Sequence, residues 1–279
     1  MSARRITART NQPSASRRSR PAPSARAATI RRPAVSRSAT ERARETWAVV
    51  LSDVDLSEEA PFVAYSEFSS RGVEPRLAAY ASMDSDRADA LVAAGRYLIP
   101  TSGGWYLVSH NMFPALAAPS RTRRLAAPAG PAPEAHLAGE KAHVTYLFNA
   151  GVFGDYTGIG DLQPGYWGKS SAPEVLYRVG DARGLSTRGA QMEIDFNAQS
   201  TEAGTQVLVE AKIGVRPDTN IRQLALPHLA IGAATGQKVR SLLVEVEEPY
   251  RRYRVREMKM TGSDMATARF VRATTYLIG

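Results

Sequence analysis

Residues 191–214 constrain the fold more than any other part of the chain, because they read as a strand, a polar turn and a second strand. In the first strand Met192, Ile194 and Phe196 alternate with polar residues, which is the period of a strand with one buried face. The turn is Ser-Thr-Glu-Ala-Gly-Thr, and the second strand, Gln-Val-Leu-Val-Glu-Ala-Lys-Ile-Gly, is more fully apolar. This pattern predicts a β-hairpin within a sheet.

Charged residues come at the end of this apolar second strand. Glu210 and Lys212 are one residue apart, so both side chains point to one face, and folding the hairpin back brings Asp195 beside them. Two converging carboxylates, with the carbonyl oxygen of Ala211, make an oxygen-rich site for a hard cation such as Mg²⁺ or Mn²⁺. Lys212 would then orient an attacking water and offset charge on a phosphate. The alternative is an ordinary salt bridge between Glu210 and Lys212 at the solvent end of the hairpin.

The composition narrows the chemistry available to such a site. The chain has no cysteine, which excludes disulfides, thiolate nucleophiles, cysteine-ligated zinc and iron–sulfur clusters. Its four histidines are scattered without an H-x-x-x-H pair, so a bound metal must be held by oxygen ligands. No stretch approaches 18 consecutive apolar residues, so we expect no membrane span.

The order of Asp195 and Glu210-Ala-Lys212 resembles the core motif of the PD-(D/E)XK nuclease superfamily, whose members include type II restriction endonucleases. More closely, Q-M-E-I-D-F, V-L-V-E-A-K-I-G and N-I-R-Q-L (residues 220–224) are similar to motifs of a group of bacterial restriction-endonuclease-like proteins. E-P-R-L (74–77) and L-I-P-T-S-G-G-W-Y (98–106) match that group as well. The resemblance therefore covers nearly all of the chain from Trp47 onward.

The resemblance implies that Asp195 and Glu210 bind the metal and that Lys212 is the catalytic lysine. It also implies that Gln223, on the helix after the catalytic strands, supports the site; the alternative is a glutamine on the helix surface. Glu193 shares the strand face of Asp195 and is expected to be a further carboxylate near the metal.

The resemblance also bears on the roles of Glu174 and His228. Glu174 is the candidate for the acidic residue that the superfamily places on its first core helix, although a surface glutamate near a helix start is the alternative. The sequence departs from the group where Y-Y-P-Y becomes Ala225-Leu-Pro-His228, and we expect His228 to be structural.

The chain divides by composition into four parts. Residues 46–115 are expected to form a small α+β domain in which helices precede a hairpin, Y-L-I-P-T-S-G-G-W-Y-L-V, which is the order of a winged helix. Residues 116–142 are rich in Ala and Pro and read as a linker. Residues 143–279 are expected to form the nuclease-like domain. The predicted fold class is α+β or α/β, with a restriction-endonuclease-like core of a mixed central β-sheet flanked by helices.

Residues 1–45 are expected to be a disordered, Arg-rich tail. Residues 1–44 contain twelve arginines and one acid, a formal charge of +11, so the remaining chain carries −2 of the total of +9. Such a composition buries too little apolar surface to fold. The tail reads as an organellar transit peptide, as a basic arm that contacts phosphates, or as a segment that does little or precedes a downstream start codon.

The C-terminal sequence predicts two more strands, S-L-L-V-E-V-E-E and Y-R-R-Y-R-V-R-E-M. Arg252 and Arg254 alternate with aromatic residues on the second of these, as do Arg251 and Arg256 beside them. On an edge strand they would contact a DNA backbone, and Arg222 is expected to do the same. The alternative is a charged edge that prevents aggregation.

Together these features predict a metal-dependent endonuclease that hydrolyses phosphodiester bonds in double-stranded DNA, in the manner of a type II restriction enzyme. Bound Mg²⁺ would polarise the phosphate and lower the pKa of the attacking water. The alternatives are a non-catalytic DNA-binding protein on a nuclease scaffold, and a nuclease for branched or damaged nucleic acid. The expected partners are duplex DNA, a second copy in a homodimer and a DNA methyltransferase encoded nearby, in the cytoplasm.

Overall fold

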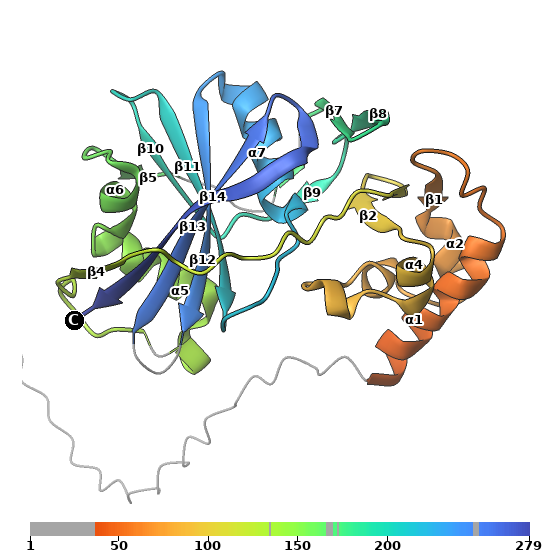
Figure 1. Ribbon diagram of the computed structural model, residues 1–279, viewed down its shortest axis with the longest axis horizontal. Coiled ribbons are helices and arrows are strands. Elements are labelled where there is room, and N and C mark those ends of the chain that lie inside the picture. Colours follow the sequence, from red (N-terminus) through yellow and green to blue (C-terminus); the bar gives the residue numbers. More distant parts are fainter. Residues whose placement is uncertain (1–36, 134, 166–169, 172, 248–250) are drawn as a thin grey trace, which may run out of the picture. The chain divides into compact units, whose positions relative to one another are not determined.

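The computed structural model describes residues 37–133, 135–165, 170–171, 173–247 and 251–279 (Figure 1). Most of the predicted tail, residues 1–36, lies outside the described residues. Its last part, residues 37–45, belongs to helix α1 (Arg37–Ser52) and was wrongly assigned to the tail. The composition hides this helix because only a narrow stripe of it is buried, at Ala43, Trp47, Val50 and Leu51.

Residues 37–113, which we call the N-terminal module, form a small α/β part with its own core. After α1 come β1 (Phe62–Ala64), α2 (Tyr65–Ser69), α3 (Pro75–Ala78), a 3-10 turn (Asp84–Asp86), α4 (Asp89–Ala93), β2 (Tyr97–Pro100) and β3 (Gly104–Val108). The predicted hairpin is present as β2 and β3, and β1 pairs antiparallel with the other edge of β3. Trp47, Phe68 and Trp105 are buried together in edge-to-face and tilted contacts.

Most strands that follow the N-terminal module form one large mixed sheet in the order β5-β10-β11-β12-β13-β14-β7-β8. Strand β4 joins it by pairing with the last residues of β14. The bounds are β4 (Thr122–Leu125), β5 (Gln163–Pro164), β7 (Leu176–Val179), β8 (Ala182–Ser186), β10 (Phe196–Ser200), β11 (Thr205–Ile213), β12 (Lys238–Glu247), β13 (Arg252–Thr261) and β14 (Asp264–Ile278). The last strand, β14, was not predicted.

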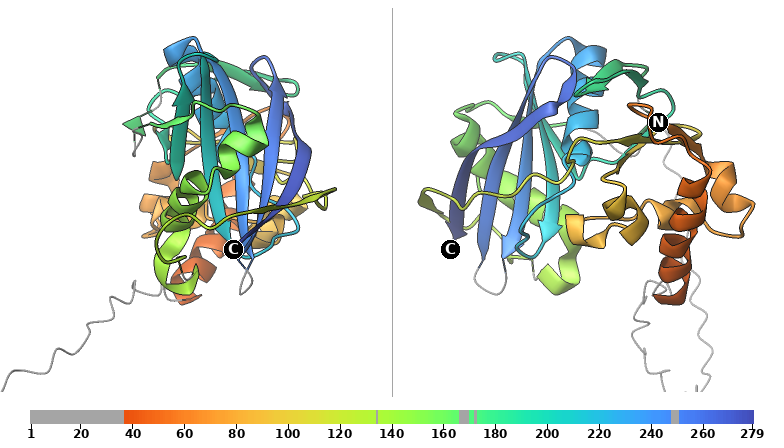
Figure 2. Two further views of the ribbon diagram at one scale, coloured as in Figure 1. Left: turned by 90° about the vertical axis from the view of Figure 1, so that its left-hand side faces the viewer. Right: turned by 45° about the vertical axis from the view of Figure 1, so that its right-hand side comes forward.

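Helices cover both faces of this sheet (Figures 1 and 2). α5 (Ala135–Asn149) and α6 (Val152–Thr157) pack on one face, where Val207, Val209 and Ala211 of β11 meet them. α7 (Arg222–Thr235) lies on the other face, against Leu208. Because α7 connects the parallel neighbours β11 and β12, both faces of β11 are covered, which explains its apolar sequence. The predicted mixed sheet flanked by helices is therefore confirmed.

The segment predicted to be a linker is part of the sheet. Residues 116–142 contain β4 and the first residues of α5. β4 is largely exposed, yet its backbone pairs in parallel with β14 from Thr122 to Leu125. Strand pairing of this kind uses backbone groups, so an Ala- and Pro-rich composition does not reveal it.

The N-terminal module also shares a core with the large sheet. Ile99, Val108, Met112 and Phe113 pack in the same apolar cluster as residues of α7, such as Leu224. The chain from Ser36 to Gly279 accordingly forms one compact unit. None of the helices in the described ranges combines the length and apolar character needed to cross a bilayer.

The strand predicted from Gln191 onward is interrupted. Gln191 and Met192 form β9, which pairs with β6 (Ser170–Ser171) in a separate small sheet. Residues 193–195 are not in a strand, and β10 begins at Phe196. The chain bends here because its two halves pair with different partners. Asp195 therefore lies at a bend that leads into the large sheet.

Candidate active site at the β10–β11 hairpin

The β10–β11 hairpin brings Asp195 and Glu210 together. Phe196, the first residue of β10, pairs with Val209, and Asp195 comes immediately before it in the chain. The Asp195 carboxylate accepts a hydrogen bond from the backbone N–H of Ala211, with an Oδ2–N distance of 2.8 Å. The predicted hairpin is thus present and aligns the two carboxylates, while their roles stay predictions.

Glu210 and Lys212 form a buried ion pair on the face of β11 that is covered by α7. The side chains are 8% and 10% exposed, and Lys212 Nζ lies 2.5 Å from Glu210 Oε1. The alternative of a salt bridge at the solvent end of the hairpin is therefore wrong. Removing both charges from water costs free energy, and the attraction between the two charges can be smaller than this desolvation cost.

The pKa values at this site shift in one direction. Burial raises the pKa of Glu210, and the Asp195 carboxylate adds to the effect while Lys212 opposes it. Burial also raises the pKa of Asp195, against the hydrogen bond from Ala211. For Lys212, burial favours the neutral amine, but Glu210 and the other carboxylates outweigh burial and raise its pKa. All three pKa values are therefore raised: burial is the main cause for Asp195 and Glu210, and the neighbouring carboxylates are the cause for Lys212.

A fourth ionisable residue, Glu140, comes from helix α5. Its carboxylate contributes to the raised pKa values of both Glu210 and Lys212. Gly139, with φ of 68°, breaks the helical conformation immediately before it. The sequence analysis missed Glu140 because residues 116–142 read as a linker. Val144 and Leu147, one helical turn apart and both fully buried, were the signal that a helix follows.

Glu174, expected on the first core helix, is not on a helix. It is exposed and lies two residues before β7, where the Ser186 hydroxyl is 3.4 Å from its carboxylate. The first helix on the large sheet is instead α5, which carries Glu140. The prediction failed because S-A-P-E-V-L-Y-R-V, with its β-branched and aromatic residues, enters a strand rather than a helix.

Glu193 lies at the exposed rim of the cluster. Its side chain is 51% exposed and lies 4.0 Å from the Lys141 ammonium of α5. Neither Glu193 nor Asp195 is in a strand, so the two residues do not share a strand face as expected. The negative charge of Glu193 also contributes to the raised pKa of Asp195, but less than burial does.

Gln223 and Arg222 begin helix α7, as the sequence analysis expected for Gln223. The β11–α7–β12 crossover places this end of α7 at the end of β11 that carries Glu210 and Lys212. Gln223 Oε1 is buried and has no hydrogen-bond partner among the described residues. A buried side-chain oxygen without a partner is not expected for a glutamine on the helix surface.

The C-terminal arginines are not on an edge strand. β13 lies inside the sheet between β12 and β14. Arg252 and Arg254 are partly buried and pair with Glu247, at 3.5 Å and 3.0 Å. Arg256 is buried and pairs with Glu245. The edge-strand expectation was wrong because β14 adds a further strand beyond β13.

His228, which we expected to be structural, contacts a neighbouring strand. It is largely buried on α7, and its Nδ1 lies 3.0 Å from the Ser241 hydroxyl of β12. Burial lowers its pKa, so the neutral ring is favoured.

The donor groups at the site fit a magnesium ion held by few protein ligands. The described residues contain no group of three or more His, Asp or Glu side chains arranged to hold a metal ion. Mg²⁺ commonly uses one or two carboxylates and takes its remaining ligands from water and substrate phosphates. Asp195 and Glu210 supply two carboxyl groups that could serve as such ligands.

By its fold the chain is a mixed α+β protein, with a large mixed sheet, helices and a small N-terminal α/β part. It belongs to the family described as a domain of unknown function (DUF6997), whose model matches residues 123–277. The match runs from β4 through β14 and leaves out the N-terminal module. No curated protein and no solved structure matches the chain.

Proposed function

We propose that this protein is a metal-dependent endonuclease that hydrolyses phosphodiester bonds in double-stranded DNA. The observation that carries the proposal is the convergence of Asp195, Glu210 and Lys212 on a buried hairpin. A buried strand end with this much charge is costly to fold, so a functional reason is required. The likeness of these residues to the PD-(D/E)XK motif supplies the reaction class.

Asp195 and Glu210 would hold the magnesium ion in this proposal. Bound Mg²⁺ supplies Lewis-acid chemistry that stabilises negative charge on phosphate oxygens and lowers the pKa of water. The Lys212 ammonium is positioned beside Glu210 and would donate a hydrogen bond to a charged phosphate oxygen. Glu140 adds negative charge from α5, which would strengthen cation binding.

Charge indicates which part of the protein meets the DNA. Residues 116–279 contain 20 basic and 16 acidic residues, a formal charge of +4. Residues 46–115 contain four basic and nine acidic residues, a formal charge of −5. A polyanion would therefore be attracted to the large-sheet part and repelled by most of the N-terminal module.

A non-catalytic DNA-binding protein is the second candidate function. Its support is the N-terminal module, in which α1, β1, short helices and the β2–β3 hairpin follow one another with strand order β1-β3-β2, a winged-helix-like arrangement. The charge of −5 argues against DNA binding by this module. In such a protein DNA binding would be the same with Mg²⁺ or chelator, and no strand would be cut.

The test is incubation of purified protein with linear, branched and mismatched duplexes, with Mg²⁺ or with EDTA. We expect Mg²⁺-dependent cleavage, and we expect Asp195→Asn and Lys212→Ala to reduce its rate by at least about a hundredfold. Both variants should still bind DNA. The branched and mismatched substrates distinguish restriction-like cleavage from action on branched or damaged DNA.

A matched control is Glu202→Gln, which removes an exposed carboxylate from the turn of the same hairpin. Its cleavage rate should equal that of the wild type. An Asp195→Asn protein that cuts at the wild-type rate, or a wild type that cuts equally in EDTA, would contradict the proposal. For a restriction role we further expect a homodimer and a DNA methyltransferase encoded nearby.

A further inference from the structure

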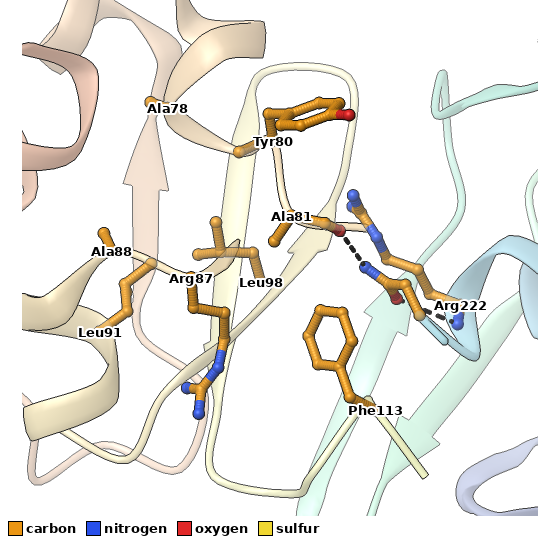
Figure 3. Close-up of a pocket in the computed structure, with 11 residues that line it drawn as sticks. Ala78, Tyr80, Ala81, Arg87, Ala88, Leu91, Leu98, Phe113 and Arg222 are labelled. Carbon is orange, nitrogen blue, oxygen red and sulfur yellow. Dashed lines mark hydrogen bonds between the residues drawn. The ribbon is translucent and has the colours of Figure 1, made fainter. Parts of the chain in front are cut away.

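A small pocket lies where the N-terminal module meets the start of helix α7 (Figure 3). The module contributes Tyr80, Arg87 and Leu98, while Asn220 comes from the loop before α7 and Arg222 is the first residue of α7. The cavity has a volume of about 10 Å³, which is roughly the space that one water molecule needs. A single oxygen atom of a larger group would fit, while a whole nucleotide would not.

The guanidinium of Arg222 has unmet hydrogen-bonding capacity in this pocket. Among the described residues it forms no side-chain hydrogen bond or ion pair, and its buried Nε has no partner. Figure 3 shows its side chain extending from α7 toward the segment that carries Tyr80 and Ala81. Burial lowers the pKa of Arg222 to about 10, so the group remains a cation at neutral pH.

The other arginine of the pocket is different because its charge is already balanced. Arg87 Nε lies 2.6 Å from Asp84 Oδ1, and its Nη1 donates to the Arg96 carbonyl at 2.9 Å. Its guanidinium also lies 3.9 Å from the centre of the Tyr97 ring. Arg87 is thus a structural residue, which leaves Arg222 as the pocket's unbalanced cation among the described residues.

The surroundings of Arg222 favour an anion. Arg222 is the first residue of a 14-residue helix whose first turn has no acidic side chain, so the positive end of the helix dipole is not neutralised. Tyr177 is 2% exposed, its hydroxyl has no hydrogen-bond partner among the described residues, and it interacts electrostatically with Arg222. An unpaired cation and an unpaired hydroxyl are both costly to bury.

Arg222 is connected directly to the candidate active site. The loop 214–221 leaves β11 just after Lys212 and ends at Arg222. This loop is held to the N-terminal module, where the Ile221 N–H donates to the Met112 carbonyl at 2.9 Å and the Asp84 N–H donates to Asp218 Oδ1 at 3.1 Å. The module therefore fixes the position of Arg222 relative to the strand that carries Lys212.

We propose that Arg222 is a phosphate-binding residue whose guanidinium takes an oxygen of the DNA backbone, so that the N-terminal module completes the substrate site by holding the loop in place. The identity of the phosphate rests on the proposed nuclease function, whereas the anion site itself rests on the pocket. The neighbouring acidic surface of the module would then limit how far the DNA extends.

The test is DNA binding by the full chain in EDTA, where no cleavage takes place, measured by fluorescence anisotropy of a labelled duplex over a range of salt concentrations. Arg222→Gln should weaken binding about tenfold at low salt. The slope of log affinity against log salt should become shallower by about 0.9, as for one lost phosphate contact. Arg222→Lys should retain the slope and lose only part of the affinity.

The matched control is Arg183→Gln, which removes an exposed arginine from β8. It should leave both the affinity and the slope unchanged. If Arg222→Gln and Arg183→Gln behave alike, the inference is overturned even if the wild type cleaves DNA. Conversely, a wild type that binds through Arg222 but never cleaves supports the anion site and overturns the nuclease proposal.

A second measurement, thermal melting, tests the inference if the variant misfolds or if the wild type binds no duplex. Because glutamine removes a partly buried charge, Arg222→Gln should melt at or above the wild-type temperature in phosphate-free buffer. Added inorganic phosphate should raise the melting temperature of the wild type and not that of the variant. A wild type that neither binds duplex nor gains stability from phosphate overturns the inference.

Discussion

Buried charges on the α7-facing side of the sheet fall into two kinds. The pair Glu245 and Arg256, 0% and 1% exposed, is bonded to the rest of the fold on both sides. Glu245 accepts a hydrogen bond from the Arg216 N–H at 2.8 Å, and Arg256 donates to the Ala117 carbonyl at 3.2 Å. This pair fixes two loops to the sheet. The cluster around Glu210, by contrast, places the carboxyl groups of Asp195 and Glu210 near the Lys212 ammonium.

The structural role of Glu245 leads to a stability prediction. Glu245→Gln leaves the buried Arg256 guanidinium without a counter-charge, so the free energy of unfolding should fall by about 3–5 kcal/mol. Urea denaturation followed by circular dichroism measures this change. The double variant Glu245→Leu with Arg256→Met removes both charges and should recover most of the loss.

The control is Glu247→Gln, on the same strand face two residues away. Its partners Arg252 and Arg254 are 42% and 25% exposed, so this variant should lose no more than about 1 kcal/mol. If Glu245→Gln and Glu247→Gln lower the free energy of unfolding equally, burial does not make the Glu245–Arg256 pair more important for stability, and the prediction is wrong.

At the scale of elements, the three-stranded sheet of the N-terminal module depends on one glycine. A Cβ at Gly104 would lie 2.0 Å from the Val63 carbonyl oxygen and 2.7 Å from Phe62. Gly104 begins β3 and pairs with Ala64 of β1. At this position only glycine allows β1 and β3 to pair so closely.

Gly104→Ala should accordingly destabilise the protein by about 2–3 kcal/mol, because β1 must move away from β3. The adjacent Gly103→Ala is the matched control, since its Cβ would meet only Phe62 at 3.9 Å. Thermal melting of the two variants makes the comparison. A Gly104→Ala protein as stable as Gly103→Ala would show that the strands separate without cost.

At the scale of the whole molecule, the N-terminal module and the large sheet are expected to unfold together. They share the cluster that joins Ile99, Val108 and Phe113 to α7, and β4 ties the connecting segment to β14. A flexible linker between independent domains would instead allow two separate transitions.

This expectation can be measured in a Trp167→Phe variant, whose remaining tryptophans, Trp47 and Trp105, report on the N-terminal module. Their fluorescence and the far-ultraviolet circular dichroism should give the same urea midpoint. Midpoints that differ clearly would mean that the module unfolds by itself.

The sequence by itself determined two local features, the β10–β11 hairpin with Asp195 near Glu210 and the β2–β3 hairpin. Both follow from the spacing of apolar residues within a short stretch, where side-chain period and backbone conformation are directly linked. The helix that carries Gln223 was expected from the resemblance to the nuclease family.

Only the tertiary structure decided which distant residues meet. It brought Glu140 to the hairpin, placed β13 inside the sheet, and enclosed Arg222 in a pocket with the N-terminal module. These outcomes depend on backbone pairing and on packing between segments far apart in the chain, and composition records neither. An exposed-looking arginine or a linker-like segment can therefore be internal, since burial is a property of the assembled fold.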